Sequence, residues 1–181
     1  LENHYKNGSK FSGHISHKYI PGIEVSTGSL GHGLGIGTGI AYSAKIQNKS
    51  YRTFVLLSDG ELDEGSNWEA LLFISHHKLN NLITLIDYNK LQSLGTVSST
   101  LNLEPIVKKF EAFGFKVFDI DGHNHQEIFN SLKNALDSSK PCLILCNTIK
   151  GKGVSFMENS VLWHYRSPQG EEYKLAKKEL S

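Results

Sequence analysis

The sequence has little cysteine, proline or methionine. Of its 181 residues, 2 are cysteine, 4 are proline and 1 is methionine. Cys142 and Cys146 fall in one apolar run, where four residues of extended chain would place them about 13 Å apart, too far for a disulfide bond. Reduced cysteines favour a cytoplasmic protein. Because Met157 stands far from the first residue, we expect that an upstream segment is missing from this sequence.

An excess of charge and long hydrophobic runs are also lacking. The 19 Lys and Arg residues against 18 Asp and Glu residues give a net charge of +1. Without a basic block we expect no nucleic-acid partner. No apolar run approaches the ~20 residues of a membrane span, and no secretory signal pattern appears in the sequence. The length suits one domain that buries roughly 70% of the surface of its unfolded chain.

Apolar runs alternate with helical patterns along most of the chain. A run that is apolar throughout indicates a strand with helices over both of its faces. Helix and strand alternate four times with short links, which predicts an α/β domain with a parallel sheet and right-handed crossovers. The strands are expected within 54–58, 82–86, 115–120 and 141–148, and the helices within 28–45, 66–78, 104–113, 124–138 and 167–181.

An acidic stretch with a glycine follows the first apolar run. Asp59 and Gly60 come directly after this run, and Asn89, 30 residues after Asp59, comes just past the second. Open α/β sheets place their ligands at the carboxyl ends of the strands, so the two side chains could meet there. A carboxylate, an amide oxygen and a backbone carbonyl suit Mg²⁺, which shares its other ligands with phosphates. The alternative is a common Asp-Gly turn and an Asn that caps a second turn.

This spacing resembles the thiamine diphosphate motif of the transketolase family, in which Gly-Asp-Gly is followed by Asn at a similar distance. The resemblance implies a thiamine diphosphate-binding fold, with a parallel sheet and helices on both faces. It also implies that Asp59, Asn89 and the Leu91 carbonyl bind Mg²⁺ (or Ca²⁺ or Mn²⁺). Gly60 and Glu61 would then lie at the cofactor. One departure is Ser58, which replaces the first glycine of the family motif. The likeness continues through Glu64-Gly65, Glu69-Ala70, Asn81-Leu82-Ile83 and Asp87-Tyr88-Asn89-Lys90, and spans about residues 13–166.

A glycine-rich segment, 28–39, resembles the part of the family that packs beside the thiamine. Its closely spaced glycines do not suit a stable isolated helix, but they suit a helix whose backbone lies against a cofactor or another subunit. The resemblance therefore makes Gly28 and Leu30 cofactor contacts. Close packing between helices is the alternative.

Two histidines match catalytic positions of the family. Gly13-His14 and the stretch 21–28 resemble the segment that brings a histidine to the active centre. Lys150-Gly151-Lys152-Gly153 and Trp163-His164 resemble the segment that returns a histidine to the cofactor phosphates and substrate. A surface-loop role for His14 and an interface role for His164 are the alternatives. His123 and His125, beside the expected helix cap at Asn124, are expected to be structural.

Two acids, Glu64 and Glu69, lie just before and within the first turn of the helix expected within 66–78. Glu64 and Glu69 suit the first turn of a helix, where the dipole stabilises carboxylates. The resemblance instead suggests a glutamate cluster across a subunit interface, in which shared carboxylates raise one another's pKa and relay protons. Glu64 is therefore the third candidate catalytic residue. We expect Trp68, Leu71 and Leu72 on the inner side of this helix.

The resemblance as a whole implies that residues 1–181 are the diphosphate-binding domain of a split transketolase, in its amino-terminal subunit. The implied reaction is the thiamine diphosphate- and Mg-dependent transfer of a two-carbon ketol unit between sugars. A carboxyl-terminal subunit with the pyrimidine-binding domain would be the partner, and self-association would give a cytoplasmic heterotetramer. Two alternatives stay open. A 2-oxo acid dehydrogenase E1 alpha-type subunit shares the metal motif, and Ser58 and the residues after His14 also allow a non-catalytic cofactor-binding protein.

Overall fold

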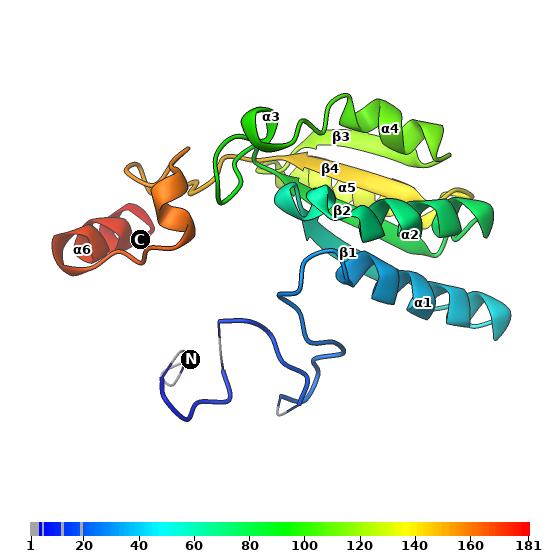
Figure 1. The fold of residues 1–181 in the computed structure, drawn as a ribbon, viewed down its shortest axis with the longest axis horizontal. Helices are drawn as coiled ribbons and strands as arrows, with labels where there is room; N and C mark the ends of the chain where they lie inside the picture. Colours follow the sequence, from blue (N-terminus) through cyan, green and yellow to red (C-terminus); the bar gives the residue numbers. More distant parts are fainter. Residues whose placement is uncertain (1–3, 5, 12, 19) are drawn as a thin grey trace.

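A four-stranded parallel sheet forms the centre of the molecule (Figure 1). The structure is a computed structural model that describes residues 4, 6–11, 13–18 and 20–181. In the order β1-β2-β4-β3, every neighbouring pair is parallel, which confirms the predicted α/β fold with a parallel sheet. All four carboxyl ends therefore lie at one edge of the sheet. The strands are β1 (Thr53–Ser58), β2 (Leu82–Tyr88), β3 (Lys116–Asp121) and β4 (Cys142–Asn147).

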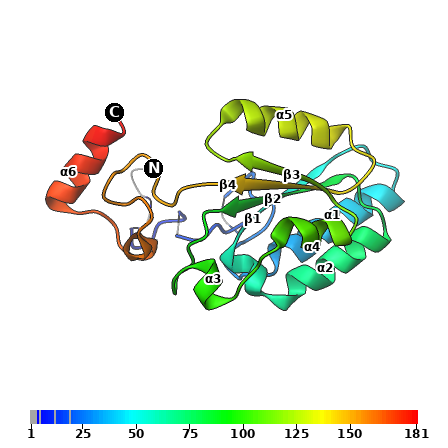
Figure 2. The ribbon, with the colours of Figure 1, turned by 90° about the horizontal axis from the view of Figure 1, so that it is seen from above.

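Helices cover the two faces of the sheet unequally. Helices α1, α2 and α4 pack on one face and α5 on the other (Figure 2). Helix α5 begins where predicted, because the Asn124 side chain accepts hydrogen bonds from the N–H groups of Gln126 and Glu127. The helices are α1 (Gly33–Ile46), α2 (Gly65–His76), α3 (Val97–Thr100), α4 (Ile106–Ala112), α5 (His125–Leu136) and α6 (Gly170–Glu179), with 3₁₀ turns η1 (Gly60–Asp63) and η2 (Val161–His164).

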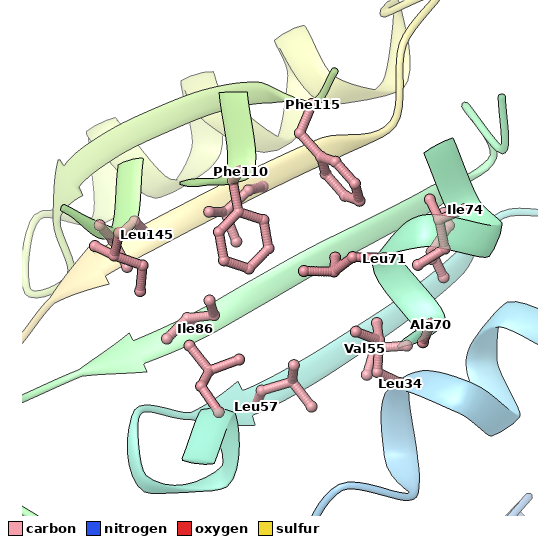
Figure 3. Close-up of a cluster of buried hydrophobic side chains, with 14 of the residues drawn as sticks. Leu34, Val55, Leu57, Ala70, Leu71, Ile74, Ile86, Phe110, Phe115 and Leu145 are labelled. Atoms are coloured by element: carbon pink, nitrogen blue, oxygen red, sulfur yellow. The ribbon is translucent and has the colours of Figure 1, made fainter. Parts of the chain in front are cut away.

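The main core lies between the sheet and helices α1, α2 and α4 (Figure 3). Leu71 of α2 is fully buried there, and Trp68 is half-buried against the same cluster, as predicted. The prediction for Leu72 is wrong, because its side chain is 62% exposed. Successive helical residues are rotated by about 100°, and the buried stripe of α2 continues through Ile74, so Leu72 is turned to the outer side.

Strand β1 is an edge strand covered on one face only by the described residues. Val55 and Leu57 are buried under α1 and α2, whereas Phe54 and Leu56 on the other face are 50% and 70% exposed. The expectation of helices over both faces is therefore wrong for this strand. The reason is the strand order, because α5 packs on β3 and β4, the two strands farthest from β1.

The two terminal segments lie beyond the edge where the strands end (Figures 1 and 2). Helix α6 is tied to the loop after β4, because Ser155 donates to Glu179 from its N–H at 2.6 Å and from its Oγ at 2.7 Å. The Trp163 Nε1 donates to the Phe156 carbonyl at 3.0 Å. These contacts join α6 and the 3₁₀ turn η2 to the loop that follows β4. Within the described part of the chain, no helix is long and apolar enough to cross a membrane.

Candidate functional site

A buried carboxylate joins the ends of the first two strands. Asp59 directly follows β1 and is 2% exposed. Its Oδ1 accepts a hydrogen bond from the Gly60 N–H at 2.7 Å, and its Oδ2 accepts one from the Lys90 N–H at 2.6 Å. Burial raises the pKa of Asp59, and the negative charge of Asp87 adds to this, while the two backbone amides and the charge of Lys150 oppose it. Two backbone amides therefore hold the carboxylate, and no ion pair to it forms among the described residues.

The turn after β2 brings the second predicted oxygen to the same edge. Asn89 Oδ1 accepts a hydrogen bond from the Leu91 N–H at 3.0 Å, so Asn89 does close a turn. An amide oxygen has two lone pairs, so this bond leaves acceptor capacity for a further ligand. Gln92 follows and packs on the acidic turn, since a Cβ atom at Gly60 would lie 3.3 Å from Gln92 Cγ. Asp59, Asn89 and Leu91 are thus held on neighbouring strand ends.

The oxygen donors at this edge fit a magnesium ion. Among residues 4, 6–11, 13–18 and 20–181, no three His, Cys, Asp or Glu side chains come together as a metal-binding group. Asp59 and Asn89 instead offer one carboxylate and one amide oxygen, and Mg²⁺ needs few protein ligands because it keeps waters and shares phosphates. A buried carboxylate with a raised pKa is also stabilised by a nearby cation.

The loop before α1 packs tightly against the acidic turn. The Gly31 N–H donates to Glu61 Oε1 at 3.0 Å, and Ser66 Oγ donates to the Gly31 carbonyl at 2.7 Å. Gly31 has φ +81°, and a Cβ atom there would lie 2.5 Å from Ser66 Oγ and 2.6 Å from Glu64 Cβ. Only glycine fits at this position. The structure thus places Glu61 and Glu64 against the glycine-rich segment.

The amino-terminal segment brings His14 to the same loop. Gly28 has φ +109°, and a Cβ atom there would lie 2.8 Å from both Cγ and Nδ1 of the His14 ring. The approach is supported by the backbone, where the Thr27 N–H donates to the Ile15 carbonyl at 3.1 Å. Leu30, two residues on, is 51% exposed and presents an apolar side chain to solvent. The predicted residues His14, Gly28 and Leu30 therefore belong to one surface.

The loop after β4 carries the second predicted histidine. Lys150 Nζ lies 3.3 Å from His164 Nδ1. Burial and the charge of Lys150 lower the pKa of His164, so its imidazole is neutral at pH 7. The charge of Lys150 also makes a small contribution that opposes the raised pKa of Asp59. Lys152 instead forms an ion pair with Glu158, in which Nζ lies 3.7 Å from Oε1.

The chain alone does not assemble the suggested glutamate cluster. Glu64 and Glu69 are both exposed, and the described residues hold no group of three acids or histidines around them. A cluster across a subunit interface stays a prediction. Sequence reasoning missed two side-chain ties near the strand ends: the Thr148 Oγ1 hydroxyl donates to Asp87, and the Ile149 N–H donates to His123. No local sequence pattern predicts either hydrogen bond, because each joins residues at the ends of different strands.

Known proteins share this arrangement. Residues 1–181 match the family described as "Transketolase, thiamine diphosphate binding domain". Over 181 residues the chain is 42% identical to an apulose-4-phosphate transketolase subunit of Actinobacillus succinogenes, covering 99% of this chain and 65% of that protein. It is 38% identical over 174 residues to a 6-deoxy-6-sulfo-D-fructose transketolase subunit of Clostridium sp., covering 96% and 63%. The chain thus spans less than two thirds of these relatives.

A solved structure gives the same result for the fold. The crystal structure of transketolase from Campylobacter jejuni superposes on this chain with a TM-score of 0.90 at 36% sequence identity. The match covers 98% of this chain and 29% of that one.

Proposed function

The chain belongs to the transketolase family, and from this premise we propose that it is the diphosphate-binding, amino-terminal subunit of a two-chain transketolase. Such an enzyme transfers a two-carbon ketol unit between sugars. The observation that carries the proposal is the buried Asp59 carboxylate, held at the ends of β1 and β2 by the Gly60 and Lys90 amides. It stands where this fold class places its ligands.

The residues at the strand ends would hold the metal and the cofactor. Asp59, Asn89 and the Leu91 carbonyl would bind Mg²⁺, or Ca²⁺ or Mn²⁺ in its place, and the metal would bind the diphosphate. Gly60 and Glu61 would border the diphosphate. When bound, thiamine diphosphate supplies the carbon nucleophile and electron sink for the reaction.

The loop residues would complete the cofactor site. Gly28 and Leu30 would lie beside the thiamine, because Gly28 has no side chain and Leu30 offers an exposed apolar one. His14, packed on Gly28, would reach the same place.

The two histidines would serve the substrate. A neutral His164 can accept a proton or a sugar hydroxyl hydrogen, and burial, followed by the positive charge of Lys150, lowers its pKa and favours this neutral form. His14 would bind sugar hydroxyls from the opposite segment. Glu64 would act only across a subunit interface, since it is exposed in the chain by itself.

The names of the relatives support a class of substrate, and the cysteines support a location. The two relatives are named for apulose-4-phosphate and 6-deoxy-6-sulfo-D-fructose, both sugars with an acidic group. We therefore propose an anionic ketose as the donor for this enzyme. The transketolase names favour ketol transfer over the 2-oxo acid dehydrogenase reaction. Cys142 and Cys146 are unpaired, as suits the proposed cytoplasmic location.

Self-association would use the outer side of α1. Among the residues that the structure describes, no atom outside this helix lies within 4 Å of a Cβ atom placed at Gly35 or Gly39, so no packing among them requires these glycines. Ile36 and Ile40 beside them are 40% and 37% exposed. A flat helix side with exposed isoleucines suits close contact with a second copy. Together with a carboxyl-terminal subunit that carries the pyrimidine-binding domain, this would give a heterotetramer.

The proposal is tested by reconstitution. The complete natural chain that contains these residues is purified, by itself or together with the candidate partner, and assayed for ketol transfer with Mg²⁺ and thiamine diphosphate. We expect activity near zero for the chain alone, because in the proposed two-chain enzyme the pyrimidine-binding domain belongs to the partner subunit. Activity should appear when the partner is added. Robust transfer by the complete chain alone would show that the site is self-contained and would refute the split-enzyme proposal.

A further inference from the structure

The turn between β3 and α5 is pressed against the end of β4. The Gly122 N–H donates to the Asn147 carbonyl at 2.8 Å, and a Cβ atom at Gly122 would lie 2.5 Å from Thr148 Cγ2. The next residue, His123, donates its N–H to Asp121 Oδ1 at 2.8 Å. The backbone at His123 is therefore held by contacts of its own, separate from those of the ring.

The His123 ring holds the first residue of the loop that follows β4. Its Nε2 accepts a hydrogen bond from the Ile149 N–H at 2.8 Å, although the two residues are 26 positions apart. A backbone amide can only donate, so this ring nitrogen carries no proton and the ring hydrogen is on Nδ1. His123 thus acts here as a neutral acceptor.

The residue after Ile149 is Lys150, whose side chain lies beside His164 in the candidate site. The loop turns tightly at this point, because the Lys152 N–H donates to the Ile149 carbonyl at 3.1 Å and the Asn159 N–H donates to the Lys150 carbonyl at 2.9 Å. Lys150 Nζ lies 3.3 Å from His164 Nδ1. Because these hydrogen bonds hold the backbone on both sides of Lys150, the position of the Ile149 amide determines where the Lys150 side chain can extend.

We propose that His123 is a positioning residue whose neutral imidazole fixes the Ile149 amide and so places Lys150 beside His164. The hydrogen bond and its effect on Lys150 do not depend on what the enzyme does. The effect on turnover rests on the proposed function. His123 would have no contact with substrate or cofactor.

The direct test is hydrogen exchange of the Ile149 amide, followed by NMR in this chain. His123→Leu removes the acceptor, whereas His123→Gln keeps an oxygen that can reach the place of Nε2. We expect exchange at Ile149 to become about fivefold faster in His123→Leu, the size of a net hydrogen bond of about 1 kcal/mol, and to return to the wild-type rate in His123→Gln. His125→Leu is the matched control, since His125 is an exposed histidine on the first turn of α5.

A second readout follows the position of Lys150. Its charge helps to lower the pKa of His164, after burial as the main cause. In His123→Leu the NMR titration of the His164 ring should move up toward its ordinary pKa, and His123→Gln should restore it. Unchanged Ile149 exchange and an unchanged His164 titration in His123→Leu would each overturn the proposal.

Kinetics of the reconstituted enzyme separates this inference from the proposed function. We expect His123→Leu to lower kcat more than it raises KM for the cofactor, with rescue by His123→Gln. If no ketol transfer is found, the proposed function fails while the exchange and titration results still decide the role of His123. If exchange is unaffected and transfer is normal, the positioning role fails alone.

Discussion

The metal site is tested most sharply by Asp59→Asn, which we expect to abolish the stabilisation given by Mg²⁺ and thiamine diphosphate together. The two side chains have nearly the same shape, so the substitution removes the charge and one acceptor. Without metal, ionised Asp59 destabilises the fold above its raised pKa, and this penalty is relieved as the pH falls toward its ordinary value of 3.8. Asparagine removes that penalty but turns an NH₂ group toward the N–H of Gly60 or Lys90, which costs about 1–3 kcal/mol. The two effects oppose each other, so the metal-free stability should change little.

The expected size of the metal effect follows from linkage. A ligand present at 100 times its Kd, and bound by the folded state alone, raises the free energy of unfolding by about 2.7 kcal/mol. In a domain of this size each 1 kcal/mol raises the midpoint of thermal unfolding by about 2–4 °C. The wild-type chain should therefore melt about 5–11 °C higher with metal and cofactor than in a chelator. Asp59→Asn should lose nearly all of this shift.

The assay is thermal unfolding with Mg²⁺ and thiamine diphosphate, compared with a chelator. Asp137→Asn is the matched control, because Asp137 is an exposed residue at the carboxyl end of α5, at the opposite end of the sheet. Asn89→Ala should reduce the shift less than Asp59→Asn, since contacts to a charged oxygen are stronger. A full metal-dependent shift in Asp59→Asn would show that Asp59 is not a ligand.

Three further predictions concern catalysis, packing and acid stability. His164→Ala should lower kcat/KM by about 100-fold or more with an unchanged circular dichroism spectrum, and wild-type kinetics would leave this histidine a structural role. In the chain by itself, Gly31→Ala should lower the free energy of unfolding by about 1–3 kcal/mol in urea titration because of its φ of +81° and its close neighbours. Gly39→Ala, which has open space around it in the monomer, should stabilise the monomer by up to about 1 kcal/mol, and equal effects would contradict this. Tyr88 donates to Glu104 at 2.6 Å and holds the pKa of Glu104 below its ordinary 4.5, so this contact stabilises the fold above pH 4.5 and is lost as the pH falls through the lowered pKa. Tyr88→Phe should therefore cost about 1 kcal/mol at pH 7 and flatten the loss of stability in acid, and an unchanged acid profile would refute the reasoning.

The fold and the strand-end residues could be predicted because they depend on local patterns. Three strands are short apolar runs and β3 alternates, and the links between the strands are long enough for a helix, which leaves a parallel sheet as the consistent arrangement. Parallel strands share one carboxyl edge, so Asp59 and Asn89, each next to the end of a run, had to lie near each other. Their register follows, with Ser58 beside Asp87 in the paired strands. The resemblance to transketolases supplied their roles, which local patterns do not contain.

Contacts between distant segments could not be predicted in this way. The approach of His14 to Gly28, of Lys150 to His164 and of His123 to Ile149 depends on where loops are carried by the packed sheet.

The same limit explains the two wrong predictions of burial. An apolar run shows that a strand can be buried, and helical spacing shows that one side of a helix is apolar. Neither shows which element will lie opposite. Phe54 and Leu56 are exposed because the order β1-β2-β4-β3 places α5 over the far strands, and Leu72 is exposed because α2 turns Leu71 and Ile74 to the sheet. Local residue patterns thus determine the elements and their ends, whereas strand order and packing, which arise from contacts across the whole chain, determine what each side chain meets.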